Sequence, residues 1–80
     1  MNDIPPWARR LDLSPKWAVN ASGLEINGES FLVADLYALD RSTTIALVAD
    51  ATEHNLRFQL LPHPRSREKV QVLVWKDEGA

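Results

Sequence analysis

The chain has 80 residues, 45% hydrophobic and 25% charged, which is enough for one small folded domain and argues against intrinsic disorder. It contains no cysteine, which excludes disulfides, thiolate chemistry and cysteine-ligated zinc and fits a reducing compartment. Nine basic and eleven acidic residues give a net charge of −2, so we expect no long-range attraction to nucleic acid or anionic lipid.

Residues 1–16 are predicted to form an extended N-terminal arm, because Pro5-Pro6 and Ser14-Pro15 each disfavour helix just before the proline. Between them, WARRLDL allows one short helical turn with Pro6 near its start. The start of the chain has neither the basic segment nor the apolar stretch of a signal peptide. No run reaches the roughly 18–20 apolar residues that span a membrane. We therefore expect a cytoplasmic protein without membrane contact.

Residues 17–76 carry the pattern of a single antiparallel β domain. Short alternating or β-branched runs are separated by turns, and they predict about six strands, near residues 17–19, 24–26, 30–37, 43–50, 56–60 and 70–75. The short turns leave no room for a crossover between parallel strands. We expect a small antiparallel β-barrel or a curled meander, with residues 77–80 as a disordered tail.

The segment LEINGESFLVADLYALD, residues 24–40, contains the strongest turn signal in the chain. Asn27-Gly28 favours a two-residue hairpin, because such turns need positive φ at both central positions. This hairpin places Leu24 opposite Phe31 and Ile26 opposite Glu29, and it predicts a strand over 30–37.

That predicted strand is apolar on both faces. Leu32, Leu36 and Leu39 also fit one side of a helix, so a helix within 31–40 is the alternative. As a strand, the segment has a second face of Leu32, Ala34, Leu36 and Ala38. VQVLVW at 70–75 shows the same two-faced character. We expect the extra apolar faces to be covered by barrel closure, by the arm or by another chain.

Signals for catalysis and metal binding are weak. His54 and His63 lie in predicted turns and lack a metal-ligand partner at i+2 or i+4. The sequence also has no phosphate-binding loop, nucleophile elbow or HExxH motif. We therefore expect that the protein is not an enzyme and that it has no cofactor and no metal site.

Three aspartates stand at informative positions. Asp40 and Asp50 are placed where turns begin, so both are expected to cap or bridge a turn. Asp35 lies inside an apolar strand. It is expected to face solvent at a sheet edge, to discourage edge-to-edge pairing or to pair with Arg57.

The loop HPRSREK, residues 63–69, is basic. A β-barrel that presents Arg65, Arg67 and Lys69 beside an exposed aromatic residue is one way to bind single-stranded nucleic acid. Glu68, the acidic overall charge and the lack of an RNP-like pattern favour a solvated loop instead. Nucleic-acid binding is the alternative function.

Trp7, Trp17 and Trp75 stand near the two ends of the chain. They are expected either to join the arm to the first and last strands and close the barrel, or to contact a partner. The sequences WAVNASGLEING and FLVADLYALD resemble the opening hairpins of small bacterial β-barrels, including PH-like domains and the small barrels of phage head–tail joints. This resemblance implies a barrel and assigns no functional residue.

A small chain with no catalytic motif and with extra apolar strand faces is expected to bind another protein stoichiometrically. We predict a non-catalytic accessory, adaptor or inhibitor protein of a bacterial or phage system that is able to form homo-oligomers. A structural component of a phage head–tail joint is the second alternative. The predicted partner-binding residues lie in the arm, on the apolar strands and in the basic loop: Trp7, Arg9, Arg10, Leu32, Leu36, Arg65, Arg67 and Trp75.

Overall fold

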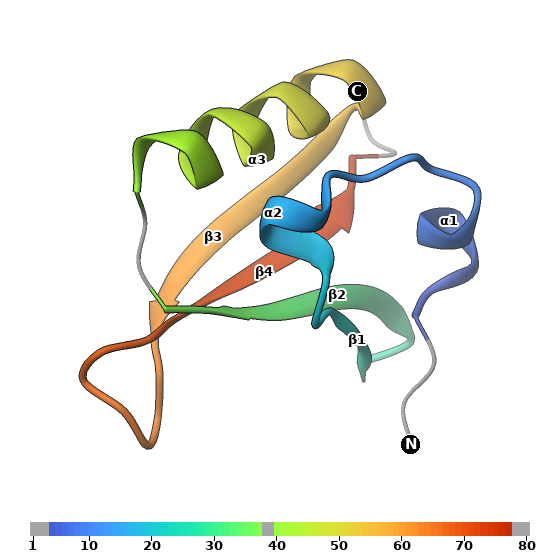
Figure 1. The fold of residues 1–80 in the computed structure, drawn as a ribbon. Coiled ribbons are helices and arrows are strands. Elements are labelled where there is room, and N and C mark those ends of the chain that lie inside the picture. Colours follow the sequence, from blue (N-terminus) through green and yellow to red (C-terminus); the bar gives the residue numbers. More distant parts are fainter. Residues whose placement is uncertain (1–3, 38–39, 78–80) are drawn as a thin grey trace.

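The computed structural model describes residues 4–37 and 40–77, which form an antiparallel four-stranded sheet with helices on one side (Figure 1). The elements in chain order are α1 (Pro6–Arg9), α2 (Pro15–Ala18), β1 (Ser22–Ile26), β2 (Glu29–Leu36), α3 (Arg41–His54), β3 (Leu56–Pro62) and β4 (Val70–Lys76). The strand order is β1-β2-β4-β3, so β1 and β3 are the edges of an open sheet. The expected barrel of about six strands, which the resemblance also implied, is wrong.

The predicted hairpin is confirmed. Asn27 and Gly28 have φ of 51° and 83°, as a tight turn between twisted strands requires. The register pairs Leu24 with Phe31 and Ile26 with Glu29, and the chain continues as β2 and not as a helix. Ala38 and Leu39, which entered the competing strand and helix patterns, lie outside the described residues.

Helix α3 replaces the strand expected at 43–50 and the turn expected at 50–55. Asp40 caps its start by accepting a hydrogen bond from the N–H of Thr43 at 2.7 Å. Asn55 ends it in the left-handed conformation, with φ 60°. The β-branched residues favoured a strand, but the preference of each is small and tertiary packing of the helix outweighs it.

The connection through α3 is a crossover between parallel strands, which the sequence analysis wrongly excluded. β2 and β3 are each antiparallel to β4, so they run parallel to each other with β4 between them. The 14 residues of α3 give the chain the length that such a connection needs. Of the described helices, none is both long and apolar enough to cross a membrane.

Two short helices shape the N-terminal arm. α1 is the helical turn predicted after Pro6, whereas α2 stands where a strand was expected near 17–19. Pro15 begins α2 because its fixed φ suits the first helical position, and the Ser14 hydroxyl accepts a hydrogen bond from the N–H of Lys16 at 3.2 Å. The Ser-Pro pair therefore starts a helix here instead of preventing one.

The core lies between the helices and one face of the sheet. Trp17 of α2 and Leu47 of α3 are buried against Leu32, Val72 and Val74, and each of these five is at most 2% exposed. Three apolar residues of the arm, Trp7, Leu11 and Leu13, pack against this cluster. The arm thus covers one face of the central strands.

The C-terminal end of the described chain is held by the sheet. Asp77, expected to begin a disordered tail, donates its N–H to the Asn55 carbonyl oxygen at 3.0 Å. The rest of that predicted tail, residues 78–80, lies outside the described residues.

The cap at Asp40 makes part of the stability depend on pH. The backbone N–H of Thr43, followed by its hydroxyl, lowers the pKa of Asp40 below its usual range, and nearby Lys16 adds to the effect. A carboxyl whose pKa is lower in the folded state stabilises the fold above its unfolded pKa of about 3.9, and this contribution is lost as pH falls through the folded pKa. Asp40→Asn keeps a capping oxygen but has no carboxyl group to protonate. Between roughly pH 5 and pH 3, the unfolding free energy of this variant should therefore fall less than that of the wild type. Urea unfolding followed by circular dichroism measures this, and identical pH profiles would contradict it.

Candidate functional site

The face of the sheet away from the helices carries a continuous apolar surface, which we call the open face. Because side chains alternate along a strand, the residues between the buried core positions point to this side. Its apolar members are Leu24, Ile26, Phe31, Val33, Leu61, Leu73 and Trp75. Within the described ranges, none of the three helices covers it (Figure 1).

The open face is exposed most strongly at its β1 edge. Leu24 and Ile26 are 40% and 44% exposed, whereas the other members are half-buried by their neighbours. A shallow groove of about 330 Å³ crosses the face from β1 to β3 and is lined by Val33, Leu61 and Leu73 among others. The groove gives a partner side chain room to pack beside the strands.

A polar group of three residues lies at one end of the open face. Asp35 accepts a hydrogen bond from the Gln71 amide at 3.1 Å and faces His63 Nε2 at 3.3 Å. His63 Nδ1 accepts the N–H of Arg65, so the ring hydrogen lies on Nε2 and is donated to Asp35. Asp35 is thus on a central strand, not at an edge, and the predicted pairing with Arg57 is wrong.

At the other end of the open face, β2 and β4 separate. Their pairing stops at Leu32 and Val74, although β2 begins at Glu29 and β4 continues to Lys76. The Ser30 carbonyl oxygen in the separated part accepts a hydrogen bond from the Trp7 indole N–H at 3.3 Å. The separation opens a space between two strands that are neighbours elsewhere in the sheet.

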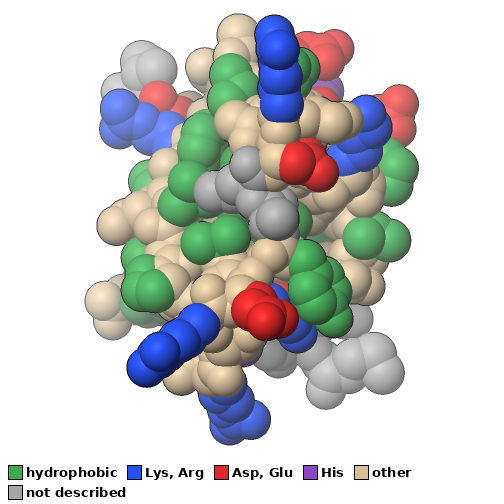
Figure 2. All heavy atoms as spheres, turned by 60° about the vertical axis from the view of Figure 1, so that its left-hand side comes forward, with side chains coloured by type: hydrophobic (Ala, Val, Ile, Leu, Met, Phe, Trp, Pro, Cys, Tyr) green, Lys and Arg blue, Asp and Glu red, His purple; other side chains and the backbone are tan. Residues whose placement is uncertain are grey.

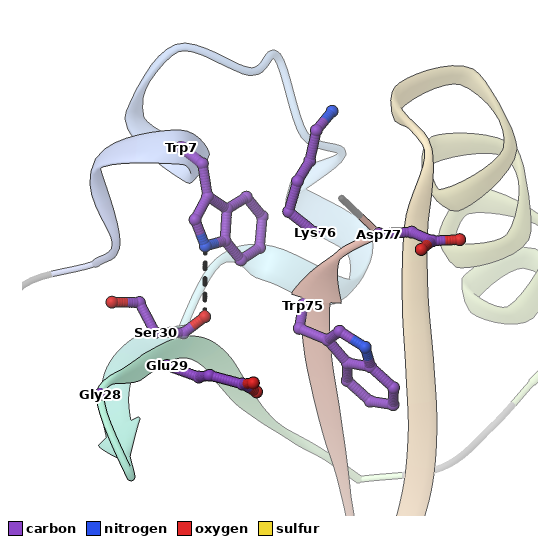
Figure 3. A pocket seen from close by; sticks show the side chains of 7 residues that line it. All are labelled: Trp7, Gly28, Glu29, Ser30, Trp75, Lys76 and Asp77. Atoms are coloured by element: carbon purple, nitrogen blue, oxygen red, sulfur yellow. Dashed lines mark hydrogen bonds between the residues drawn. The ribbon is translucent and has the colours of Figure 1, made fainter. Parts of the chain in front are cut away.

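This space, which we call the tryptophan cleft, has a volume of about 490 Å³ and is lined by Trp7, Gly28, Glu29, Ser30, Trp75, Lys76 and Asp77. Figure 3 shows Trp7 entering from the arm, and Glu29 and Trp75 on the sheet side. The Trp75 ring meets the Phe31 ring edge to face, with centroids 5.8 Å apart. Trp75 therefore belongs to both the open face and the cleft.

The charges around the cleft differ in their partners. The Lys76 ammonium donates to the His54 carbonyl oxygen at 2.6 Å, at the C-terminus of α3. Asp77 faces the Arg57 guanidinium at 3.8 Å. The Glu29 side chain makes no hydrogen bond or ion pair with another residue in the described part of the chain. The cleft thus holds one carboxylate that is available to a ligand.

The predicted site residues fall into four places. Trp7 and Trp75 line the same cleft. Arg9 and Arg10 are exposed on the arm, and Arg65 and Arg67 are exposed on the β3–β4 loop. Leu32 and Leu36 were predicted to contact a partner, but they are only 1% and 6% exposed beneath the helices. This prediction is wrong because the helices cover that side of β2.

The three tryptophans do not form one cluster. Trp17 lies in the core, where its indole N–H donates to Asp50 Oδ2 at 2.8 Å. The same oxygen accepts the backbone N–H of Ser14 at 2.8 Å. Asp50, which was expected to cap a turn, is instead a buried helix residue that holds the arm to α3.

Asp50, Glu53 and His54 bring possible metal-ligand atoms within 4.8 Å of one another at the end of α3. This group was not predicted from the sequence, because these residues were expected in a turn. In a turn, unlike in a helix, a spacing of four residues does not place Asp50 and His54 side by side. Asp50 Oδ2 already accepts two hydrogen bonds from the arm. These bonds give Asp50 a structural role without a metal ion.

Apart from Trp75, the residues of the open face and Glu29 were not predicted as site residues. The two-faced pattern of β2 and β4 indicated an apolar surface on each side of these strands, but it did not distinguish the two faces. Comparison of the chain with protein-family models, with curated proteins and with solved structures gives no match.

Proposed function

We propose that this chain is a small protein-binding domain, an accessory, adaptor or inhibitor, that docks on its partner through the open face. The observation that carries the proposal is the row of apolar side chains on β1, β2 and β4 on the side away from the helices. Contiguous exposed apolar surface on a small domain is typical of an interaction site.

The composition of the open face supports a protein partner. Phe31 and Trp75 provide the aromatic residues that are enriched at the centres of protein interfaces. Asp35, Gln71 and His63 form a polar border in which Gln71 and His63 both contact the Asp35 carboxylate. These contacts within the chain lower the cost of covering the polar groups when a partner docks.

A nucleic-acid partner receives less support. In the loop, the Lys69 ammonium lies 4.9 Å from the centre of the Tyr37 ring, and Arg65 and Arg67 remain exposed. On the described surface in Figure 2, the Lys and Arg side chains stand at separate places with acidic side chains between them. On this face the distribution provides no continuous basic path for a phosphate backbone, and the net charge of −2 adds no long-range attraction to nucleic acid.

Helix α3 supplies a matched control for the docking surface, because it exposes an isoleucine of its own. Ile26 on the open face is 44% exposed and Ile45 on α3 is 58% exposed. Ile26→Thr should weaken binding of the partner by about 1 kcal/mol, roughly fivefold, because apolar contact area is lost. Ile45→Thr should leave it unchanged. Proteins retained from a lysate by each immobilised variant are quantified, and the affinity of a retained protein is then measured.

Three outcomes would contradict the proposal. Equal losses for the two variants, or a loss only with Ile45→Thr, would move the site away from the open face. Retention of nucleic acid that is released steeply by salt would favour the alternative partner. A protein that retains nothing and stays monomeric by light scattering at high concentration would leave the open face without a partner.

A further inference from the structure

We propose that the tryptophan cleft binds an arginine side chain of the partner protein. The inference rests on the proposed function, because it names an anchor for a partner that docks on the adjoining open face. Trp75 connects the two surfaces, since its ring meets Phe31 of the open face edge to face and also lines the cleft.

The volume and lining of the cleft determine the class of ligand. About 490 Å³ lies within the range of roughly 300–1,000 Å³ typical of sites for small ligands. Two tryptophans and two carboxylate residues line this space, and of the two carboxylates Asp77 is paired with Arg57 whereas Glu29 is not paired with a described residue. An arginine fits this combination, because its planar guanidinium stacks on an indole face and donates parallel hydrogen bonds to a carboxylate.

The electrostatic balance of the cleft favours a cation over an anion. The ammonium of Lys76, the one basic residue among the described residues of the lining, donates a hydrogen bond to the His54 carbonyl oxygen at the negative end of α3. Asp77 is turned to Arg57. Glu29 remains with no partner among the described residues, so a cation that enters the cleft finds an unpaired carboxylate beside it.

The separation of β2 and β4 explains why this site lies where it does. A continued ladder would bring the two strands together and close the space. Here the pairing ends at Leu32 and Val74, and the Trp7 indole instead bonds the Ser30 carbonyl oxygen. Trp7 thus stabilises the separated end of the sheet and at the same time forms a wall of the cleft (Figure 3).

The test is an NMR titration of the full chain with N-acetyl-arginine amide, with N-acetyl-citrulline amide as the uncharged probe of the same shape. The three tryptophans give three indole N–H signals. Those of Trp7 and Trp75 should shift saturably with the arginine probe, while that of the buried Trp17 should stay in place. The citrulline probe should bind at least about fivefold more weakly than the arginine probe, because the charge attraction is lost.

Two matched variants locate the carboxylate. Glu29→Gln should weaken binding of the arginine probe by about fivefold, whereas Glu68→Gln should leave it unchanged, because Glu68 is an exposed carboxylate at the opposite end of β4. Equal binding of both probes, equal effects of both variants, or shifts of the Trp17 signal instead of the other two would overturn the proposal.

The titration with the arginine probe and the binding test of Ile26→Thr can fail independently of each other. Ile26 does not line the cleft, so Ile26→Thr should not change the titration with the arginine probe. Binding of arginine by a protein that retains no partner would support the cleft and contradict docking on the open face. If Ile26→Thr weakens binding of the partner but the protein does not bind the arginine probe, docking on the open face is supported and the cleft proposal is contradicted.

Discussion

Replacing Trp17 with alanine is expected to remove about 3–5 kcal/mol from the free energy of unfolding, the range for large buried aromatic residues. Trp17 is 1% exposed and joins α2 to the core. A domain of 80 residues has a total stability of roughly 4–12 kcal/mol, so this loss is a large fraction of the stability of the fold. Urea unfolding followed by far-ultraviolet circular dichroism measures the loss.

Two further variants separate the packing of Trp17 from its hydrogen bond to Asp50. Trp17→Phe keeps most of the ring and removes the N–H donor, so a loss of about 1–2 kcal/mol is expected. Asp50→Ala should lose more, because it leaves the indole N–H and the Ser14 N–H without their acceptor. Trp7→Ala, at a half-buried site, should have a smaller effect than Trp17→Ala. Equal effects at the two tryptophans would contradict the assignment of Trp17 to the core.

The parts of the fold that follow from local chemistry were predictable. Asn27-Gly28 defined the first hairpin and its register, because few residue pairs adopt positive φ at both positions. The alternation along residues 56–60 and 70–75 predicted the last two strands, which the structure extends to Leu56–Pro62 and Val70–Lys76. Each of these signals lies within a few residues and depends little on the rest of the chain.

Helix α3 was not predictable in the same way. Its outward side exposes Ile45 and Val48, so the sequence lacks the polar stripe that marks a surface helix. The spacing of Leu47, Asp50 and Ala51 is helical, but an aspartate at position 50 is also typical of a turn. Its hydrogen bonds to Trp17 and Ser14 depend on tertiary structure that the sequence does not reveal.

The candidate site was predicted only in part for a related reason. The surplus of apolar residues on β2 and β4 correctly indicated that both faces of these strands are apolar. The helices cover the face of Leu32 and Leu36, which leaves the face of Val33 and Leu73 open. Without α3, nothing in the sequence determined which face would be buried.

Leu73→Lys is expected to weaken binding of the protein partner by at least about 2 kcal/mol, roughly 30-fold. Leu73 lies on the central strand β4, opposite Val33 on one side and Gln59 on the other. In the free protein the new ammonium reaches water, so the fold should be retained. In the complex it has to be buried without a partner or displace the apolar contact, and both are unfavourable. The affinity of the purified variant for a protein retained by the wild type measures the effect.

The same substitution distinguishes the two classes of partner by the direction of the change. An added positive charge on the binding surface strengthens attraction to a phosphate backbone, so a nucleic-acid-binding protein would gain affinity with Leu73→Lys. The affinity for a protein partner that packs apolar side chains on the open face would instead fall. Val48→Lys is the matched control, because Val48 is 45% exposed on α3 and receives the same charge outside the open face. Weakening by Leu73→Lys alone locates docking on the open face, and strengthening by both variants would identify the attraction as one of net charge.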